Sequence, residues 1–170
     1  MEDIPCIFCG KSIDNIAMSE NGYKGRKCED CNLIFISPRP TSDEITNLYV
    51  DEHAISYANA QFPIEKIKII EAKATLKKII KFKKGGSLLE LGCGGGAFLA
   101  EARNFGFEPY GIELNPIECK WITSRLRIPC ETKSLNNGSF GGKMFNIIYH
   151  RDVLSHLYDP IKSFHDMNNA

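Results

Sequence analysis

An apolar segment that runs directly into a glycine-rich turn constrains this chain more than any other feature. Residues 88–91 read Leu-Leu-Glu-Leu, and glycine then stands at positions 92, 94, 95 and 96. A buried strand followed by a glycine turn and a helix brings backbone N–H groups close to a nucleotide-like ligand. The segment therefore predicts a ligand cradle at the end of a parallel strand.

Two carboxylates accompany this turn. Glu90 precedes the first glycine, and Glu113 ends the next apolar segment. A carboxylate accepts hydrogen bonds well from an ammonium group or from the two hydroxyls of a ribose. S-adenosylmethionine carries both groups, so we expect it to be the ligand, with Gly92, Gly94 and Gly96 allowing its close approach.

A dinucleotide is the alternative ligand. The spacing Gly92-x-Gly94-x-x-Ala97, with Glu113 downstream, also satisfies the dinucleotide-binding fingerprint. Glu90 weighs against NAD because its negative charge would repel a pyrophosphate. A glycine turn without any ligand is a further alternative, which the accompanying strand, helix and acids disfavour.

Four of the seven cysteines form two CxxC pairs near the N-terminus. Two such turns can bring four thiolates into a tetrahedral site, and their spacing is typical of structural zinc modules. The alternatives are two disulfides or four free thiols, which the spacing and the composition disfavour. The other three cysteines are expected to be core or turn residues. We expect Zn²⁺ to be held by Cys6, Cys9, Cys28 and Cys31.

The remaining segments follow one another in the order of a βαβ protein. We divide the chain into a zinc-ribbon-like module over 1–40, a helical connector over 41–84 and a cofactor-binding domain over 85–170. Sheets of this type normally continue with further strands, so we expect the C-terminal strands to be missing from this chain. A partner or a missing C-terminal segment would then complete the sheet. Strands are predicted at 87–91, 107–113, 128–132 and 145–149, and helices at 42–49, 63–84, 96–105, 116–126 and from 153 or 159 onward.

The predicted helix over 63–84 carries eight lysines. We expect Ile67, Ile70 and Ala74 to share its apolar face, with Ile69, Leu76 and Ile80 beside them. The lysines are then the solvated side of an amphipathic helix, and a phosphate-binding face is the alternative.

Composition limits the partners and the compartment. Lys+Arg and Asp+Glu both count 21, so the formal net charge is zero, whereas a protein that binds nucleic acid is usually basic. The N-terminus does not have the pattern of a signal peptide, and no apolar run reaches the length of a membrane span. We expect a cytoplasmic protein whose partner is a small molecule rather than nucleic acid or a membrane.

Polar residues follow the predicted strand over 145–149. Ligands of parallel sheets bind beyond the carboxyl ends of the strands, so His150 and Arg151 would face the cofactor, and His156 would lie near the transferable methyl group. A histidine there could remove a proton from an acceptor hydroxyl or an acidic carbon. A local hydrogen bond at a helix start is the alternative role for His156.

Together these motifs resemble class I S-adenosylmethionine-dependent methyltransferases that carry an N-terminal zinc-ribbon-like domain. The likeness rests on the two CxxC pairs, the Ser-Pro-Arg-Pro turn at 37–40 with Tyr49, and the E-x-G-x-G-x-G loop at 90–96. It also rests on Glu113 with Asn115 and on the stretch DVLSHLYDP at 152–160.

The resemblance implies an α/β, Rossmann-like sheet and methyl transfer to carbon or oxygen of a small molecule, often a sugar or another secondary metabolite. A non-catalytic or truncated cofactor-binding or zinc module, and an RNA methyltransferase, remain the alternatives. The likeness further implies that Glu90, Gly92, Gly94 and Gly96 hold the methionine part, Glu113 the ribose, Leu114 the adenine face, Leu135 the adenine edge, and His150 and Arg151 the methionine end.

Overall fold

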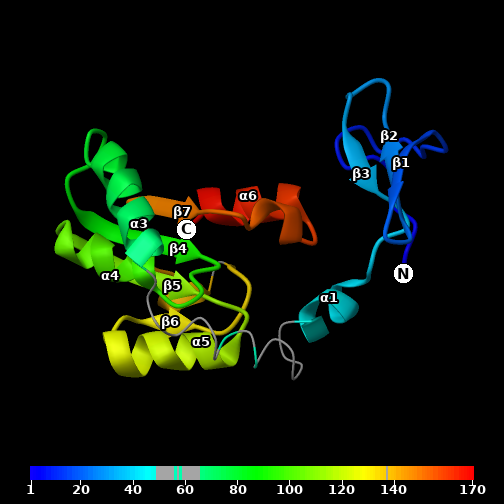
Figure 1. The fold of residues 1–170 in the computed structure, drawn as a ribbon. Helices are drawn as coiled ribbons and strands as arrows, with labels where there is room; N and C mark the ends of the chain where they lie inside the picture. Colours follow the sequence, from blue (N-terminus) through cyan, green and yellow to red (C-terminus); the bar gives the residue numbers. More distant parts are fainter. Residues whose placement is uncertain (49–55, 57, 59–65, 137) are drawn as a thin grey trace. The chain divides into compact units, whose positions relative to one another are not determined.

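The computed structural model describes residues 1–48, 56, 58, 66–136 and 138–170. It divides into two compact units, Met1–Ile45 and Thr46–Ala170 (Figure 1). Each unit has its own sheet, and the two sheets are of opposite kinds. The end of the predicted helix over 42–49, the start of the predicted helix over 63–84 and the segment between them lie outside the described residues, apart from residues 56 and 58.

The first unit contains a small antiparallel sheet whose hairpin turns at Asn21 and Gly22, both of which have positive φ. Such a turn matches the twist of the strands that it joins. The buried core of the unit consists of only Cys6, Cys28 and Phe35. A core of this size needs a further source of stability. The strand order is β1 (Ile16–Glu20), β2 (Tyr23–Lys27), β3 (Ile34–Ile36).

A capping box opens α1 (Ser42–Leu48). The Glu44 N–H donates to Thr41 Oγ1 at 3.3 Å, and the Thr41 N–H donates to Glu44 Oε2 at 2.8 Å. This reciprocal pair satisfies two backbone donors at the helix start. Thr41 is therefore the N-cap of α1.

The second unit is built on a parallel sheet with the strand order β6 (Cys130–Glu131), β5 (Phe107–Ile112), β4 (Gly86–Leu91), β7 (Ile147–His150). The chain leaves β4 for β5 and β6 on one side and later returns to place β7 on the other side. A topological switch point therefore lies between β4 and β7, where ligands of such sheets bind. The predicted α/β, Rossmann-like fold is confirmed.

The described helices and turns of this unit agree in order with the prediction but are generally shorter. The predicted helix over 116–126 ends in a π-helical turn, and the last helix begins at Pro160 with Asp159 as its N-cap. No helix in the described ranges is long and apolar enough to cross a membrane. The elements are α3 (Lys66–Ile79), α4 (Ala97–Asn104), α5 (Pro116–Trp121), η1 (Ile122–Leu126), η2 (Ser139–Gly141), η3 (Leu154–His156) and α6 (Pro160–Asn168).

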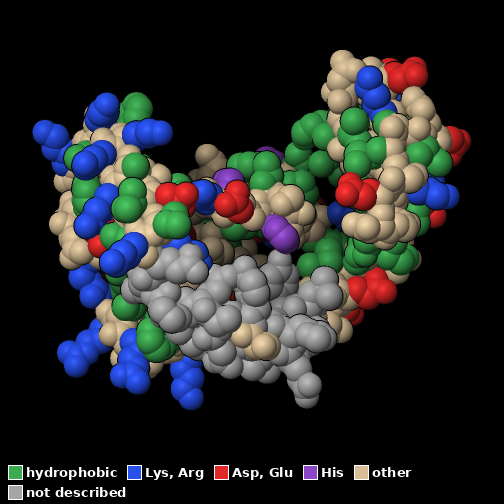
Figure 2. Space-filling view, in the orientation of Figure 1, with side chains coloured by type: hydrophobic (Ala, Val, Ile, Leu, Met, Phe, Trp, Pro, Cys, Tyr) green, Lys and Arg blue, Asp and Glu red, His purple; other side chains and the backbone are tan. Residues whose placement is uncertain are grey.

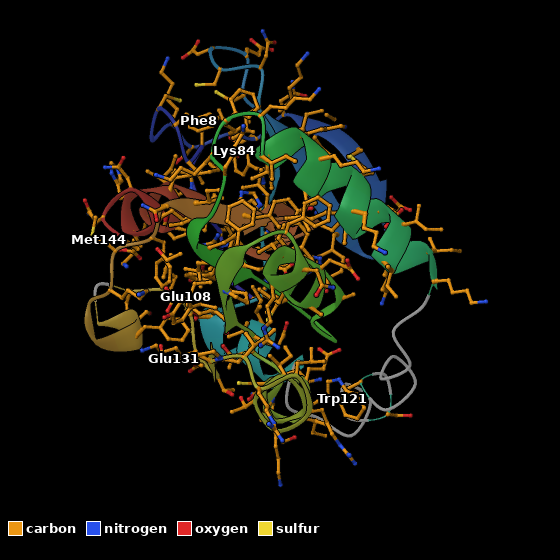
Figure 3. The ribbon with its side chains drawn as sticks, turned by 90° about the vertical axis from the view of Figure 1, so that its left-hand side faces the viewer. Phe8, Lys84, Glu108, Trp121, Glu131 and Met144 are labelled. Atoms are coloured by element: carbon orange, nitrogen blue, oxygen red, sulfur yellow. The ribbon has the colours of Figure 1, made fainter. Side chains whose placement is uncertain are left out.

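Alternate residues of β4 serve two different cores. Leu88 belongs to a cluster with residues of α3, α4 and η1, and Leu89 and Leu91 belong to a second cluster with Ile112 and, at its border, Met167 of α6. A central strand of a parallel sheet is buried on both faces, which explains why the neighbours Leu88 and Leu89, which point to opposite faces, are both apolar. Figure 3 shows this unit from the side of α3 and α4.

The predicted apolar face of α3 is wrong for Ile67, Ile70 and Ala74, whereas Leu76 and Ile80, expected beside that face, do pack on the core. Ile67 and Ile70 are each 66% exposed, whereas Ala72 and Leu76 are buried. The spacing Ala72, Leu76, Ile80 forms an i, i+4 row that packs on the same core as α4. Sequence periodicity could not separate the two rows, because isoleucines occupy both sides of the helix. Lysines and arginines do lie on the surface over α3 (Figure 2).

Candidate cofactor site and four-cysteine cluster

Three of the four glycines in the loop after β4 have positive φ, namely 65° at Gly92, 48° at Gly94 and 78° at Gly96. An L-residue rarely adopts this conformation. A Cβ atom at Gly92 would lie 2.5 Å from Val153 Cγ2, and one at Gly96 would lie 2.7 Å from Leu126 Cδ1. These two glycines therefore allow close packing of neighbouring segments within the protein.

Gly94 differs from the other two. A Cβ atom there would meet only Glu118 Oε1, at 3.8 Å, among atoms within 4 Å. Open space on this side of the backbone leaves room for a ligand to approach. Of the three glycines predicted to allow ligand approach, Gly94 has the geometry that suits this role best.

Glu113 connects the glycine loop with the end of β5. Its Oε2 accepts the N–H of Gly94 at 2.8 Å, and its Oε1 accepts the N–H of Asn115 at 3.0 Å. The side chain is buried. Each carboxylate oxygen has a second lone pair for a further donor. The carboxylate is thus held rigidly beside the loop and still has capacity for a ligand.

Glu90 is a buried acid without a complete set of partners. It is 7% exposed, and its Oε2 has no hydrogen-bond partner in the described part of the chain. Burial, and then the charge of Glu113, raise the pKa of this carboxyl well above its usual range. An orphaned carboxyl oxygen at a topological switch point is the group that a ligand ammonium or hydroxyl would satisfy. The residues present therefore fit S-adenosylmethionine.

A third acid, Glu118 of α5, joins these two and was not predicted from the sequence. It is 7% exposed, and Oε1 faces the open side of Gly94. Burial and the charge of Glu113 raise the pKa of Glu118 to about 7, against an opposing effect of Lys68. In the sequence it follows the N-cap Asn115 by three residues, which is the ordinary position of a capping-box glutamate.

Glu90 also lies in a row of neighbours across the sheet. It pairs with Tyr149 of β7 on one side and Gly111 of β5 on the other. The ring of Tyr149 stacks on Phe98 of α4 with a centroid distance of 4.1 Å. Burial and the charge of Glu90 raise the pKa of Tyr149. This aromatic pair forms an apolar wall beside the Glu90 carboxyl.

The predicted residues after β7 are exposed or paired elsewhere. His150 is half-buried and makes an edge contact with the ring of Phe164, 6.2 Å between centroids. Arg151 donates to Glu71 of α3 at 2.7 Å, which lowers the pKa of Glu71. His156 ends the turn η3 and is exposed. The structure therefore gives Arg151 a partner within the protein.

The two leucines predicted to contact adenine lie on different segments. Leu114 is half-buried and directly follows Glu113. Leu135, also half-buried, packs against the cluster of Leu89, Leu91 and Ile112 on the other sheet face. Leu114 thus stands beside the Glu113 carboxylate, and Leu135 contributes to the core under β4 and β5.

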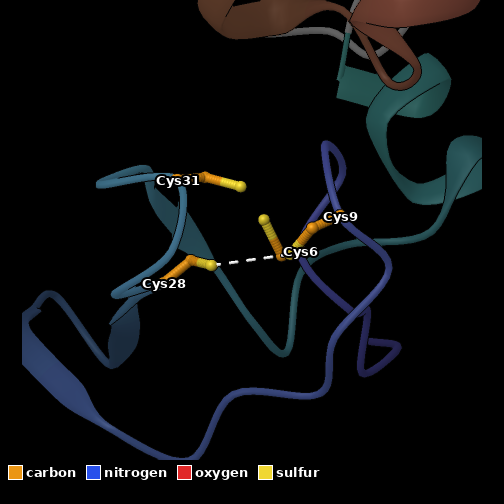
Figure 4. A group of neighbouring side chains, drawn as sticks. All are labelled: Cys6, Cys9, Cys28 and Cys31. Carbon is orange, nitrogen blue, oxygen red and sulfur yellow. Dashed lines mark hydrogen bonds between the residues drawn. The ribbon is translucent and has the colours of Figure 1, made fainter.

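The four thiols of the first unit come together as predicted (Figure 4). Their sulfur atoms all lie within 4.8 Å of one another, and Cys9 Sγ and Cys28 Sγ are 3.6 Å apart. A tetrahedral site with Zn–S bonds of about 2.3 Å has sulfur–sulfur edges of about 3.8 Å. Backbone N–H groups of Cys9 and Phe8 lower the pKa of the Cys6 thiol to about 7. The cluster is consistent with a zinc-binding module.

The other cysteines gather in the second unit, near the glycine loop. Cys93 Sγ lies 3.9 Å from Cys130 Sγ, and a hydrogen bond from the Cys93 thiol lowers the pKa of Cys130. Burial raises the pKa of Cys119 to about 11. In the described residues, only the four cysteines of the first unit form a group that could hold a metal. The remaining three pack in and around the core.

Comparison with known proteins gives a family and a set of similar solved structures. Among curated proteins, none matches this chain significantly. The X-ray structure of YjhP from E. coli, a structural genomics target, matches with 18% identity and a TM-score of 0.46, covering 63% of this chain and 45% of that one. This chain therefore spans less than half the length of that protein. A family model described as a methyltransferase domain matches residues 66–170, more than half of the chain. The chain belongs to this methyltransferase domain family, whose members depend on S-adenosylmethionine.

Proposed function

We propose that the protein transfers a methyl group from S-adenosylmethionine to carbon or oxygen of a small-molecule acceptor. The observation that carries the proposal is the buried Glu90 carboxyl with an orphaned oxygen, next to a glycine loop whose open position is bordered by Glu113. The family match over residues 66–170 supports the same chemistry.

In this proposal the residues of the chain bind the cofactor and orient it relative to the acceptor. The cofactor supplies an electrophilic methyl group on a sulfonium when it is bound. Glu90 would accept hydrogen bonds from the ammonium group, and Glu113 would accept them from the ribose through its free lone pairs. His156, exposed on η3, would remove a proton from the acceptor. Positioning of donor and acceptor is then the main contribution of the protein.

Charge pairing in the first unit supports a small acceptor over RNA. Lys11 is paired with Asp30, and Arg26 lies within 3.7 Å of Asp3 and 3.5 Å of Asp14. Basic side chains that are neutralised by neighbouring acids offer little attraction to phosphates. The zero net charge of the whole chain agrees with this.

We propose further that the four thiolates of the first unit bind one structural Zn²⁺. With four sulfur ligands the metal has no open position for substrate. Its role would be to stabilise a unit whose buried core consists of three side chains.

The proposed function is tested first by calorimetric titration with S-adenosylhomocysteine, the product of the donor, with NAD as the control ligand. Micromolar binding of the former without binding of NAD supports the proposal and leads to an assay of methyl transfer from radiolabelled donor to sugars and phenols. Binding of NAD alone would mean that the glycine loop serves a dinucleotide. Transfer to RNA but not to small molecules would contradict the acceptor class.

A further inference from the structure

Glu118 is the one acid near the glycine loop for which the proposed function has no use so far. It comes from α5, is 7% exposed, and presents Oε1 toward the open side of Gly94 at 3.8 Å from the position of a Cβ atom. In the described residues its carboxylate accepts no hydrogen bond. A buried carboxylate in this state requires an explanation, because desolvation without compensation is costly.

Capping of α5 does not explain it. A capping-box glutamate reaches back to the N–H of the N-cap residue, as Glu44 does with Thr41 at the start of α1. At α5 the N-cap is Asn115, and its N–H already donates to Glu113 Oε1 at 3.0 Å. Glu118 therefore does not make the capping-box hydrogen bond that its sequence position predicts.

Glu113 already uses part of its hydrogen-bonding capacity within the protein. Each of its oxygens already accepts a backbone N–H, from Gly94 and from Asn115. Glu113 alone therefore offers one remaining lone pair per oxygen to a ligand. A second carboxylate on the same side of the loop would supply the further acceptors that a diol with two hydroxyls can use.

An independent sign of a ligand stands next to these two acids. The Glu90 carboxyl is more than nine-tenths buried, its Oε2 has no partner in the described residues, and the Glu113 charge acts on it. Glu90 and Glu118 are both buried and both feel the charge of Glu113, so the three carboxyls gather near the glycine loop, as expected for a site that binds a molecule rich in hydrogen-bond donors.

We propose that Glu118 is a second cofactor carboxylate, which shares with Glu113 the ribose hydroxyls of the adenosyl group that passes over Gly94. This inference rests on the proposed function, since it names a residue of the same site. It assigns to α5 a direct part in ligand binding.

The proposal has a consequence for pH. The charged groups that act on Glu118 are Glu113, which follows β5, and Lys68 on α3, and Glu113 also acts on Glu90. Burial and Glu113 raise the pKa of Glu118 to about 7, so the free protein is a mixture of both forms at neutral pH. Hydroxyl donors favour the ionised form, and binding should therefore release a proton near pH 7.

The experiment is calorimetric titration of S-adenosylhomocysteine at pH 6 and pH 8 with the wild type, Glu118→Gln and Glu101→Gln. Glu101 is a largely buried acid of α4 paired with Lys73, away from the loop glycines. For the wild type and for Glu101→Gln we expect affinity about tenfold higher at pH 8 than at pH 6. Glu118→Gln should bind about tenfold more weakly than wild type at pH 8, and its affinity should not change with pH through this group.

A second measurement needs no variant. Titration of wild type at pH 7 in two buffers of different ionisation enthalpy should show release of about half a proton per ligand. Adenosine, which has the ribose but no ammonium, should show the same pH dependence. A pH dependence that persists in Glu118→Gln, or that is present with S-adenosylhomocysteine and absent with adenosine, would overturn the assignment. A wild type that binds neither ligand contradicts the proposed function itself.

Discussion

The carboxylate of Glu113 accepts the backbone N–H of Gly94 at 2.8 Å, although 19 residues separate the two in the chain. This hydrogen bond connects the ends of β4 and β5, since Gly94 belongs to the loop after β4 and Glu113 follows β5 directly. The shape of the glycine loop therefore depends on an acid from the neighbouring strand.

Replacement of Glu113 by Ala should affect both stability and binding. Two buried N–H groups, of Gly94 and Asn115, would lose their acceptor, and we expect the free energy of unfolding to fall by about 2 kcal/mol. Affinity for S-adenosylhomocysteine should fall by about a hundredfold if two charge-assisted hydrogen bonds are lost. Urea unfolding and calorimetry measure the two effects. Unchanged affinity in a folded variant would remove Glu113 from the site.

Gly94→Ala and Gly96→Ala should separate binding from packing. Both positions have positive φ, which costs an alanine about 1 kcal/mol. At Gly96 the new methyl would also lie 2.7 Å from Leu126 Cδ1 and 2.9 Å from Ile122 Cγ1, so we expect a further loss of about 1–3 kcal/mol. Gly94→Ala should fold nearly normally but bind S-adenosylhomocysteine more weakly than wild type. Thermal unfolding measures the stability of both variants, and calorimetry measures their binding. Equal destabilisation of the two variants would contradict the assignment of packing to Gly96 and of ligand approach to Gly94.

The stability of the free protein should depend on Glu118 in a defined pH window. The folded-state pKa of Glu118, about 7, lies above the ordinary 4.5, so between these values the folded state binds more protons than the unfolded state. Its stability contribution therefore falls as pH rises through this window. Glu118→Gln should match wild type near pH 5 and exceed it by about 2–3 kcal/mol at pH 8. Urea unfolding at both pH values tests this, and a variant that is less stable at pH 8 would contradict it.

Removal of zinc should unfold the first unit. Its buried core is Cys6, Cys28 and Phe35, so metal coordination would provide much of its folding free energy. We expect Cys28→Ser to lose bound zinc and the fixed structure of this unit, while the control Cys119→Ser keeps both. Metal analysis by mass spectrometry and NMR of the amide region provide the readout. Full zinc content in Cys28→Ser would show that the cluster is not the site.

His156→Gln should leave cofactor binding unchanged and lower methyl transfer. Its side chain is exposed on η3, outside the acids and glycines that would hold the cofactor. Loss of a general base typically lowers the rate by about 10²–10⁴-fold. Calorimetry with S-adenosylhomocysteine and the transfer assay on an identified acceptor separate the two effects. A normal turnover rate would assign His156 a local structural role.

Elements with a strong local signal were predictable. The glycine loop, the strands β4 and β5 and the paired CxxC turns follow from short patterns, because backbone conformation and thiol spacing are fixed by neighbouring residues. The ends of elements were less predictable: the predicted strand over 128–132 forms only Cys130–Glu131. Only Cys130 and Glu131 of that segment form backbone pairs with β5, and the local sequence does not predict where this pairing ends.

The sequence by itself determined that a glycine turn with Glu90 and Glu113 follows a buried strand, and that four cysteines stand at metal-binding spacing. Only the tertiary structure decided that Gly94 is the open glycine, that Arg151 pairs with Glu71, and that Glu118 Oε1 lies near Gly94. The physical reason is that these facts depend on contacts between segments distant in the chain. A residue's local pattern fixes its backbone, whereas its exposure, partners and pKa are set by what packs against it.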